Sequence, residues 1–312
     1  MSASSPRKVN HYQFYNEWKG HRVEHLERCH SIIRSLHPDK PIVYLAGDSS
    51  LDNKYWVPSS GPGGEPLPVA VPDIYYNILS APRTKPDIAF WLNHFLGERA
   101  TALNTSIEES MLSDRDSDLL PQDAFIRDKI GPNDVLIVSI GANDIALRPT
   151  FSTIRHMLQL AWLTRRASIE SGGGSSLAYF QELFGKKIES YIATLCSKTK
   201  PRLVIVCMIY FPLEHSAGPQ ESWAEWQLKA LGYNSYPNQL QTAIRKIYEI
   251  ATEKIKVAGT EVVPLKLYEI LDGKTSGDYV ARVEPSAEGG RKMSEAFVMT
   301  LESKDVIERS SD

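Results

Sequence analysis

A serine and an asparagine follow two apolar segments of the chain that have the composition of buried strands. Gly47-Asp48-Ser49 comes directly after the run 42–46, and Gly141-Ala142-Asn143-Asp144 comes directly after the run 135–140. A serine hydroxyl becomes a useful nucleophile when a base removes its proton and hydrogen-bond donors stabilise the oxyanion that forms. The carboxyl ends of parallel strands meet at one edge of a sheet, so we expect both motifs to contribute to one site there.

The elements that must position these residues are five short apolar runs rich in β-branched residues. They are Ile42–Ala46, Ala100–Leu103, Val135–Ile140, Leu203–Ile209 and Glu261–Leu265. Their nearly continuous apolar character is typical of parallel strands that are buried on both faces. Helix-like segments separate the runs, so we predict an α/β protein: a three-layer α/β/α sandwich around a mainly parallel five-stranded sheet. The predicted helices cover 12–36, 87–96, the stretch before Gly131, 177–197, 238–257 and 288–301.

The predicted organisation is one main domain, 39–302, with additions at both ends and two insertions. An N-terminal tail and helical extension takes 1–38, and a C-terminal tail takes 303–312. The insertion 58–72 is rich in proline and glycine and therefore forms a loop, either beside the site or on the surface. The insertion 150–176 has an apolar helical piece followed by glycines, which suits a lid or an ordinary helix with a loop behind it.

Composition excludes several classes of protein. The chain has 312 residues, of which 42% are hydrophobic and 23% charged, and a formal net charge of -3. We therefore predict no nucleic-acid partner and, because no apolar run is long enough, no membrane span. The start of the sequence lacks the apolar core of a secretion signal, and the three cysteines lack metal-ligand spacing. These features predict a cytoplasmic protein without a metal or cofactor, and they leave its oligomeric state open.

Four segments, in order along the chain, resemble the sequence blocks of the SGNH hydrolases, also called the GDSL lipase or acylhydrolase family. They are Gly47-Asp48-Ser49, Asn104-Thr105-Ser106-Ile107, Gly141-Ala142-Asn143-Asp144 and Glu284-Pro285-Ser286 with the glycines that follow. The resemblance implies that Ser49 is the nucleophile and that Asn143 donates to the oxyanion together with the backbone N–H of Ser49. It also implies that binding residues surround them. These are Gly47, Asp48, Asn104, Glu109, Gly141 and Asp144.

Two positions depart from the family pattern. Glu109 stands where the family has a glycine in its second block, although glutamate keeps the backbone N–H that the glycine supplies. In the last block, Glu284 holds the position of the usual histidine and Ala281 that of the usual aspartate. No histidine follows His215.

Three outcomes are open for the missing base. Glu284 could accept the serine proton itself if burial raises its pKa, unless it pairs with a nearby arginine, Arg282 or Arg291. A histidine from elsewhere could enter the site, with His215 better placed than His94 or His156. The third outcome is that the cleft binds without catalysing. Activity well below pH 6.5 would favour a carboxylate over a histidine.

We therefore predict a hydrolase of an acyl or acetyl ester, with a small-molecule ester or glycan-type substrate and an atypical base. The alternative is a non-catalytic protein of the same fold that binds a carbohydrate or an acylated ligand. Tyr55 and Trp56, just after Ser49, could stack on a sugar ring or cover an acyl chain. A nucleotide-binding protein is disfavoured because neither glycine-rich phosphate motif is present.

Overall fold

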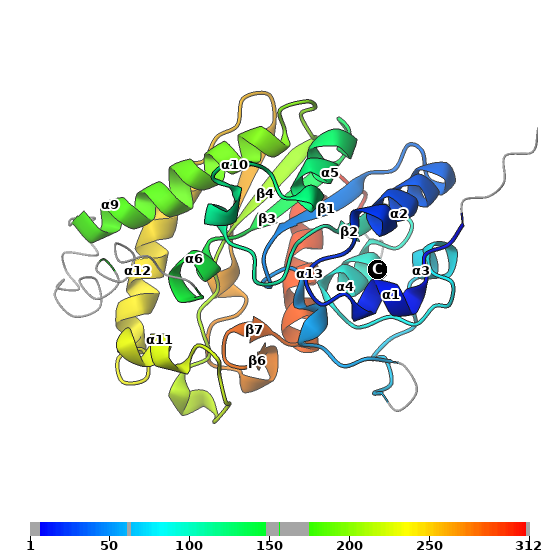
Figure 1. The fold of residues 1–312 in the computed structure, drawn as a ribbon. Coiled ribbons are helices and arrows are strands. Elements are labelled where there is room, and N and C mark those ends of the chain that lie inside the picture. Colours follow the sequence, from blue (N-terminus) through cyan, green and yellow to red (C-terminus); the bar gives the residue numbers. More distant parts are fainter. Residues whose placement is uncertain (1–6, 61–63, 148–155, 157–174, 310–312) are drawn as a thin grey trace, which may run out of the picture.

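A five-stranded parallel sheet forms the centre of the molecule (Figure 1). The computed structural model describes residues 7–60, 64–147, 156 and 175–309. The strands are β1 (Ile42–Gly47), β2 (Thr101–Asn104), β3 (Val135–Ser139), β4 (Leu203–Met208) and β5 (Glu261–Lys266). Their order is β2-β1-β3-β4-β5, and each neighbouring pair is parallel. The five strands predicted from the apolar runs are thus confirmed, with ends that differ by at most one residue.

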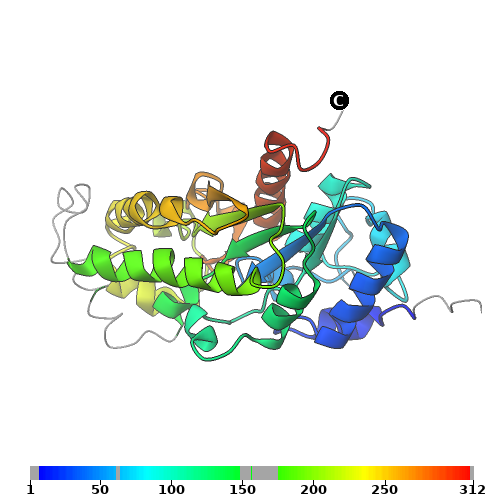
Figure 2. The same ribbon diagram turned by 90° about the horizontal axis from the view of Figure 1, so that it is seen from above.

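Helices cover both faces of the sheet, so the three-layer α/β/α sandwich is confirmed (Figure 2). Along β1, Val43 and Leu45 point to one face, and Tyr44 and Ala46 to the other. The first face is covered by α4 (Ile88–Leu96) and α13 (Ala287–Ser303). The second is covered by α2 (Val23–Leu36), α5 (Pro121–Lys129), α10 (Ile188–Leu195) and α12 (Pro237–Ile250). Apolar packing on both faces is what the lack of alternation along the strands indicated.

Several helices differ from their predicted extent. The segment 12–36 forms two helices, α1 (His11–Asn16) and α2, because the chain turns at Gly20, whose φ is 74°. The segment 177–197 consists of α9 (Ser175–Gln181), a π-helical stretch η4 (Glu182–Lys187) and α10. Helix α12 ends at Ile250, and a short 3-10 turn η6 (Thr252–Lys254) follows it.

Some short elements were not predicted from the sequence. They are the helices α3 (Asp73–Ile78), α6 (Ala142–Ala146) and α11 (Glu225–Ala230), and the antiparallel strands β6 (Tyr279–Val280) and β7 (Glu284–Pro285). Short 3-10 turns also occur. They are η1 (Asn53–Tyr55), η2 (Leu112–Arg115), η5 (His215–Ala217), η7 (Leu267–Glu269) and η8 (Ser276–Asp278).

Both ends of the described chain pack against the sheet domain. Val9, Phe14 and Leu26 of the N-terminal extension are buried in the same apolar cluster as β1, and Val306 and Ile307 near the C-terminus are buried in the other cluster. The division at residues 38 and 302 stays a prediction. Most of the insertion 150–176, predicted as a lid or a helix with a loop, lies outside the described residues, as does 61–63. In the part of the chain that the structure describes, no helix combines the length and apolar character needed to cross a membrane.

Candidate active site

The turn after β1 depends on glycine at position 47. Gly47 has a φ of 151°, and a Cβ at this position would lie 1.8 Å from the carbonyl oxygen of Ser139 on β3. No other residue fits so close to a neighbouring strand. The backbone N–H of Asp48 then donates to the same carbonyl at 3.2 Å, which fixes the turn that carries Ser49 to the edge of the sheet.

Hydrogen bonds among Asp48, Ser50 and Ser139 stabilise the turn that carries Ser49. Oδ1 of Asp48 accepts from the backbone N–H of Ser50 at 3.0 Å and from its hydroxyl at 2.7 Å. The Ser50 hydroxyl also lies 2.7 Å from the hydroxyl of Ser139. Ser49 itself is 7% exposed, and within the described chain its backbone N–H has no hydrogen-bond partner. That N–H is therefore free to donate to an oxyanion.

Asn143 and Glu109 offer two further donors. Asn143, at the start of α6, donates one amide hydrogen to the carbonyl of Ser110 at 3.1 Å, which orients the side chain and leaves its second amide hydrogen available. Glu109 has a φ of 59°, the left-handed region that favours glycine. The position where the family pattern has glycine therefore keeps a glycine-like backbone here, and its N–H has no partner among the described residues.

Glu284 is a buried carboxyl beside Ser49. It is 2% exposed; its Oε1 accepts from Nε1 of Trp223 at 3.1 Å, and its Oε2 has no partner in the described structure. Burial raises the pKa of Glu284 to about 7, and interaction with the Ser49 hydroxyl opposes this rise. A carboxyl with this pKa is partly ionised at neutral pH and suits a general base.

The arginines near Glu284 do not pair with it. Arg282 donates to Glu225 at 2.5 Å and to the carbonyl of Leu213 at 3.0 and 3.2 Å. Arg291 pairs with two glutamates of its own helix, Glu288 and Glu295. The structure therefore contradicts the ion-pair alternative for Glu284.

A tight hairpin turn presents Glu284 to the site. Ala281 and Arg282, between β6 and β7, have φ values of 49° and 66°. Val280 pairs with Glu284, so three residues connect the two strands, and two of them lie in the left-handed region that favours glycine. Arg282 is 1% exposed, so its buried guanidinium fixes this unusual turn and with it the position of Glu284.

The histidines considered as alternative bases lie elsewhere. His215 is exposed on η5, His94 is exposed on α4, and His156 stacks on Tyr179 with ring centroids 4.7 Å apart. None of the described histidines lines the two pockets around Ser49. The carboxylate of Asp278, six residues before Glu284, pairs with Lys292 at 2.8 Å.

Asn104, Gly141 and Asp144 shape the loops around the site. Asn104 donates to Asp52 at 3.0 Å, and Gly141 has a φ of 111°, where a Cβ would lie 3.1 Å from the ring of Phe184. The carboxylate of Asp144 accepts the backbone N–H groups of η2 at 2.7 and 2.9 Å. That these residues bind a ligand stays a prediction.

Two pockets meet at Ser49, Asn143, Trp223 and Glu284. The first, which we term the apolar pocket, has a volume of about 130 Å³ and lies between α6, α9–η4, α11 and α12. Its walls are mostly aliphatic and aromatic. They include Ile145, Phe180, Phe184, Met208, Leu228, Ile244 and Ile247.

The second, which we term the aromatic pocket, has a volume of about 430 Å³. Besides the four shared residues it is lined by Trp18, Tyr55, Trp56, Glu108, Glu109 and Leu147. Glu108 is 3% exposed; its Oε1 accepts from Nε1 of Trp56 at 2.9 Å, while its Oε2 has no partner in the described chain. Burial and the nearby Glu284 raise the pKa of Glu108 to about 9.

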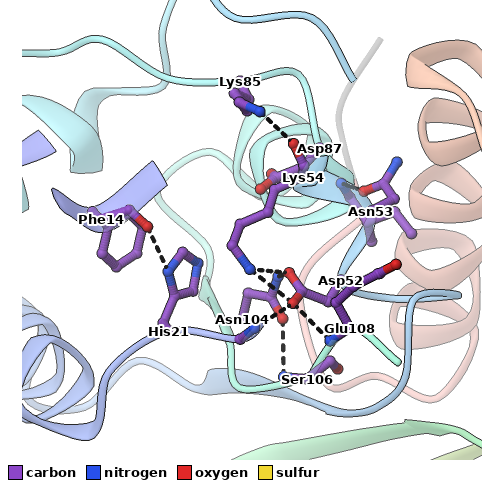
Figure 3. Close-up of polar contacts among 12 residues, drawn as sticks. Phe14, His21, Asp52, Asn53, Lys54, Lys85, Asp87, Asn104, Ser106 and Glu108 are labelled. Atoms are coloured by element: carbon purple, nitrogen blue, oxygen red, sulfur yellow. Dashed lines mark hydrogen bonds and ion pairs between the residues drawn. The ribbon is translucent and has the colours of Figure 1, made fainter. Parts of the chain in front are cut away.

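A buried polar network holds the wall of the aromatic pocket (Figure 3). At its centre, the carboxylate of Asp52 pairs with the ammonium of Lys54 at 2.7 Å, and both side chains are fully buried. Asp52 also accepts the backbone N–H groups of Gly20 and Glu108, each at 3.0 Å. Glu108 and Gly20, two residues after Trp18, are therefore held by the same carboxylate.

Several of these site residues were missed by sequence reasoning. Glu108 adjoins Glu109, which was singled out, and a second acidic residue in that block was the available signal. No sequence signal identified Trp18 or Trp223, because both lie far along the chain from the motifs and reach the site only through the fold.

No family model matches the sequence, and no curated protein matches it. Solved structures do resemble it. One is a GDSL-like lipase from Bacteroides ovatus (10% identity, 88% of this chain and 56% of that one, TM-score 0.40). A second is phospholipase A1 from Streptomyces albidoflavus (13% identity, 85% and 99%, TM-score 0.41). A third is a carbohydrate esterase family 3 protein from Talaromyces cellulolyticus (13% identity, 84% and 97%, TM-score 0.33).

These likenesses include the family predicted from the motifs, and they concern the fold alone. This chain spans about half (56%) of the length of the Bacteroides ovatus protein. The proposals below rest on the geometry of this chain.

Proposed function

We propose that this protein hydrolyses acyl esters, with Ser49 as nucleophile and Glu284 as general base. The observation that carries the proposal is the position of both side chains at the junction of the apolar and aromatic pockets, with one carboxyl oxygen of Glu284 unpaired. An ester bond at this junction would have its acyl chain in the apolar pocket and its alcohol in the aromatic pocket.

In the first step, Oγ of Ser49 forms a bond to the ester carbonyl carbon while Glu284 accepts the serine proton. The C–O bond to the alcohol then breaks, and Glu284 returns the proton to the leaving alkoxide. In the second step, water attacks the acyl-serine with Glu284 again accepting a proton. The carboxylic acid leaves, and Ser49 regains its hydrogen. Each step uses Glu284 once as a base and once as an acid.

Three donors support the tetrahedral intermediate in this proposal: the backbone N–H groups of Ser49 and Glu109 and the amide of Asn143. The two N–H groups have no other partner in the described chain, and the Asn143 side chain is already oriented by Ser110. Donors fixed in place before the reaction contribute most to such catalysis because they need no reorganisation.

The apolar pocket favours an acyl chain over an acetyl group. Each buried methylene contributes about 0.8 kcal/mol, which corresponds to about a fourfold gain in kcat/KM. A carbohydrate-binding protein without catalysis would have little use for this apolar chamber beside the serine.

Hydrolysis of p-nitrophenyl acetate, butyrate and octanoate tests the proposal. We expect kcat/KM to rise from acetate to the longer esters, and Ser49→Ala to lose at least about a thousandfold in kcat. Ser235→Ala, at an exposed serine that lines neither pocket, is the matched control. Equal slow turnover by wild type and Ser49→Ala on all three esters would overturn the hydrolase and favour the binding alternative.

A further inference from the structure

The aromatic pocket is acidic and has no protein counter-charge of its own. Glu108, Glu109 and Glu284 line it, and none of its described lining residues is lysine, arginine or histidine. Oε2 of Glu108 and Oε2 of Glu284 are buried without a hydrogen-bond partner in the described chain, and these side chains are 3% and 2% exposed. Buried carboxyl oxygens are normally paired, so two unpaired ones in the walls of one pocket favour a cation in that pocket as their counter-charge.

Aromatic rings enclose the same pocket. Trp18 and Tyr55 meet with their ring centroids 6.3 Å apart at 62°, and Tyr55 and Trp56 meet at 5.0 Å and 87°. Trp18, Tyr55 and Trp223 are 44%, 56% and 37% exposed, although they are large and apolar. Alkylated ammonium groups are recognised by several aromatic rings set at angles around one cavity, and this pocket has such a set of rings in its wall.

We propose that the aromatic pocket holds a cationic alkylammonium group on the alcohol side of the ester. This inference rests on the proposed function, because it names the leaving alcohol of that reaction. The rings would contact the alkyl groups of the ammonium, and the three acidic side chains would supply the opposite charge. The volume of about 430 Å³ is within the range of small-molecule sites.

Other alcohols fit this pocket less well. A phosphate-bearing alcohol would meet three acidic side chains and no basic one among the described lining residues. A sugar ring stacks best on a flat exposed ring face, whereas the rings here stand at 62° and 87° to one another. A neutral sugar is therefore the competing ligand that the experiment must separate.

A cation in this pocket would also change the ionisation of its walls. The pKa of Glu108 is raised to about 9, chiefly by burial and by Glu284. A bound ammonium favours the ionised carboxylate, so binding should release protons below pH 9 and tighten as the pH rises.

The decisive experiment compares butyrylcholine with 3,3-dimethylbutyl butyrate, its uncharged carbon analogue of the same shape. We expect kcat/KM to be about thirtyfold higher for the choline ester, equivalent to roughly 2 kcal/mol. Trp18→Ala and Glu109→Gln should each reduce this ratio, and Glu109→Gln keeps the backbone donor. Trp226→Ala and Glu221→Gln, exposed residues outside both pockets, are the matched controls.

A binding measurement separates this inference from the proposed function. Calorimetric titration of Ser49→Ala with tetramethylammonium should show saturable binding that strengthens with pH and is lost in Trp18→Ala. Binding without hydrolysis of any ester would overturn the hydrolase and keep the ammonium site. Equal turnover of the two butyrates without tetramethylammonium binding would overturn the ammonium site and keep the hydrolase. Faster turnover of an acetylated sugar than of the choline ester would have the same meaning.

Discussion

Replacing Glu284 by glutamine removes one ionisable group with almost no change in volume, and we expect opposite effects on activity and stability. Glutamine keeps an oxygen that can accept from Trp223, so the hairpin should keep its shape. Loss of the base should lower kcat about a hundredfold to ten-thousandfold. Burial raises the pKa of Glu284 to about 7, so wild-type kcat should rise about tenfold between pH 6 and 8. The residual kcat of the variant should not show this rise.

The stability effect has the opposite sign because the pKa of Glu284 rises from 4.5 in the unfolded chain to about 7 in the folded one. Above pH 4.5 the unfolded chain loses this proton first, so the wild-type protein loses stability until the folded pKa is passed. At pH 8 this effect lowers the free energy of unfolding of the wild-type protein by about 3 kcal/mol. Glutamine cannot ionise, so the variant avoids this loss.

Thermal unfolding by circular dichroism at pH 5 and pH 8 measures the effect. For 312 residues, about 3 kcal/mol corresponds to a Tm difference of about 5 °C. We expect Glu284→Gln to exceed wild type by that amount at pH 8 and to approach it at pH 5. Glu221→Gln, on an exposed side chain, should change neither Tm nor kcat.

Two results would refute the reasoning about Glu284. If Glu284→Gln kept kcat within threefold of wild type on p-nitrophenyl butyrate, another group would be the base. If the variant gained no stability between pH 5 and pH 8, the carboxyl would not be buried as described. The pH profile of the wild type alone does not decide, because a pKa of about 7 lies close to that of an ordinary histidine, about 6.5. The substitution is therefore a sharper test than the acid activity considered from sequence.

Three further changes test other parts of the site. Asn143→Ala should lower kcat by about a hundredfold or more with little change in KM, because the donor acts on the oxyanion; a change in KM alone would contradict this. Gly47→Ala should prevent folding, since its Cβ would lie 1.8 Å from the carbonyl oxygen of Ser139, whereas Gly277→Ala has open space and should express normally; a soluble, active Gly47→Ala would refute the packing described. His215→Ala should leave kcat unchanged, because the side chain is exposed and lines neither pocket; loss of activity would assign it a role in the reaction.

The sheet could be predicted from the sequence because each strand contains a short, nearly continuous apolar run. The meeting of Ser49 and Asn143 followed from topology: β1 and β3 are adjacent, and both end at the same edge. The backbone at Glu109 also agrees with the glycine of the family pattern, although the side chain differs.

The pockets could not be predicted, because their walls come from distant segments. Trp18 precedes the motifs by about thirty residues and Trp223 follows Asn143 by eighty, and no spacing rule connects them. The break at Gly20 was missed because the flanking segments are both helix-prone, and the turn depends on a contact between the backbone of Gly20 and Asp52. Glu284 as a raised-pKa carboxyl required burial, which only tertiary packing provides.

The contacts of Asp52 limit how far the chain can be truncated from its N-terminus. Its carboxylate accepts an N–H from the N-terminal extension and another from the loop of Glu108, while it pairs with the buried Lys54. A chain that starts at residue 39 would lose Leu26 and Ile33 from the core and expose the apolar surface that they cover. It would also leave the Asp52 carboxylate without the backbone N–H of Gly20. Truncation at that boundary should therefore destabilise the protein, because residues 7–38 pack against the same core and the same pocket wall as the sheet domain.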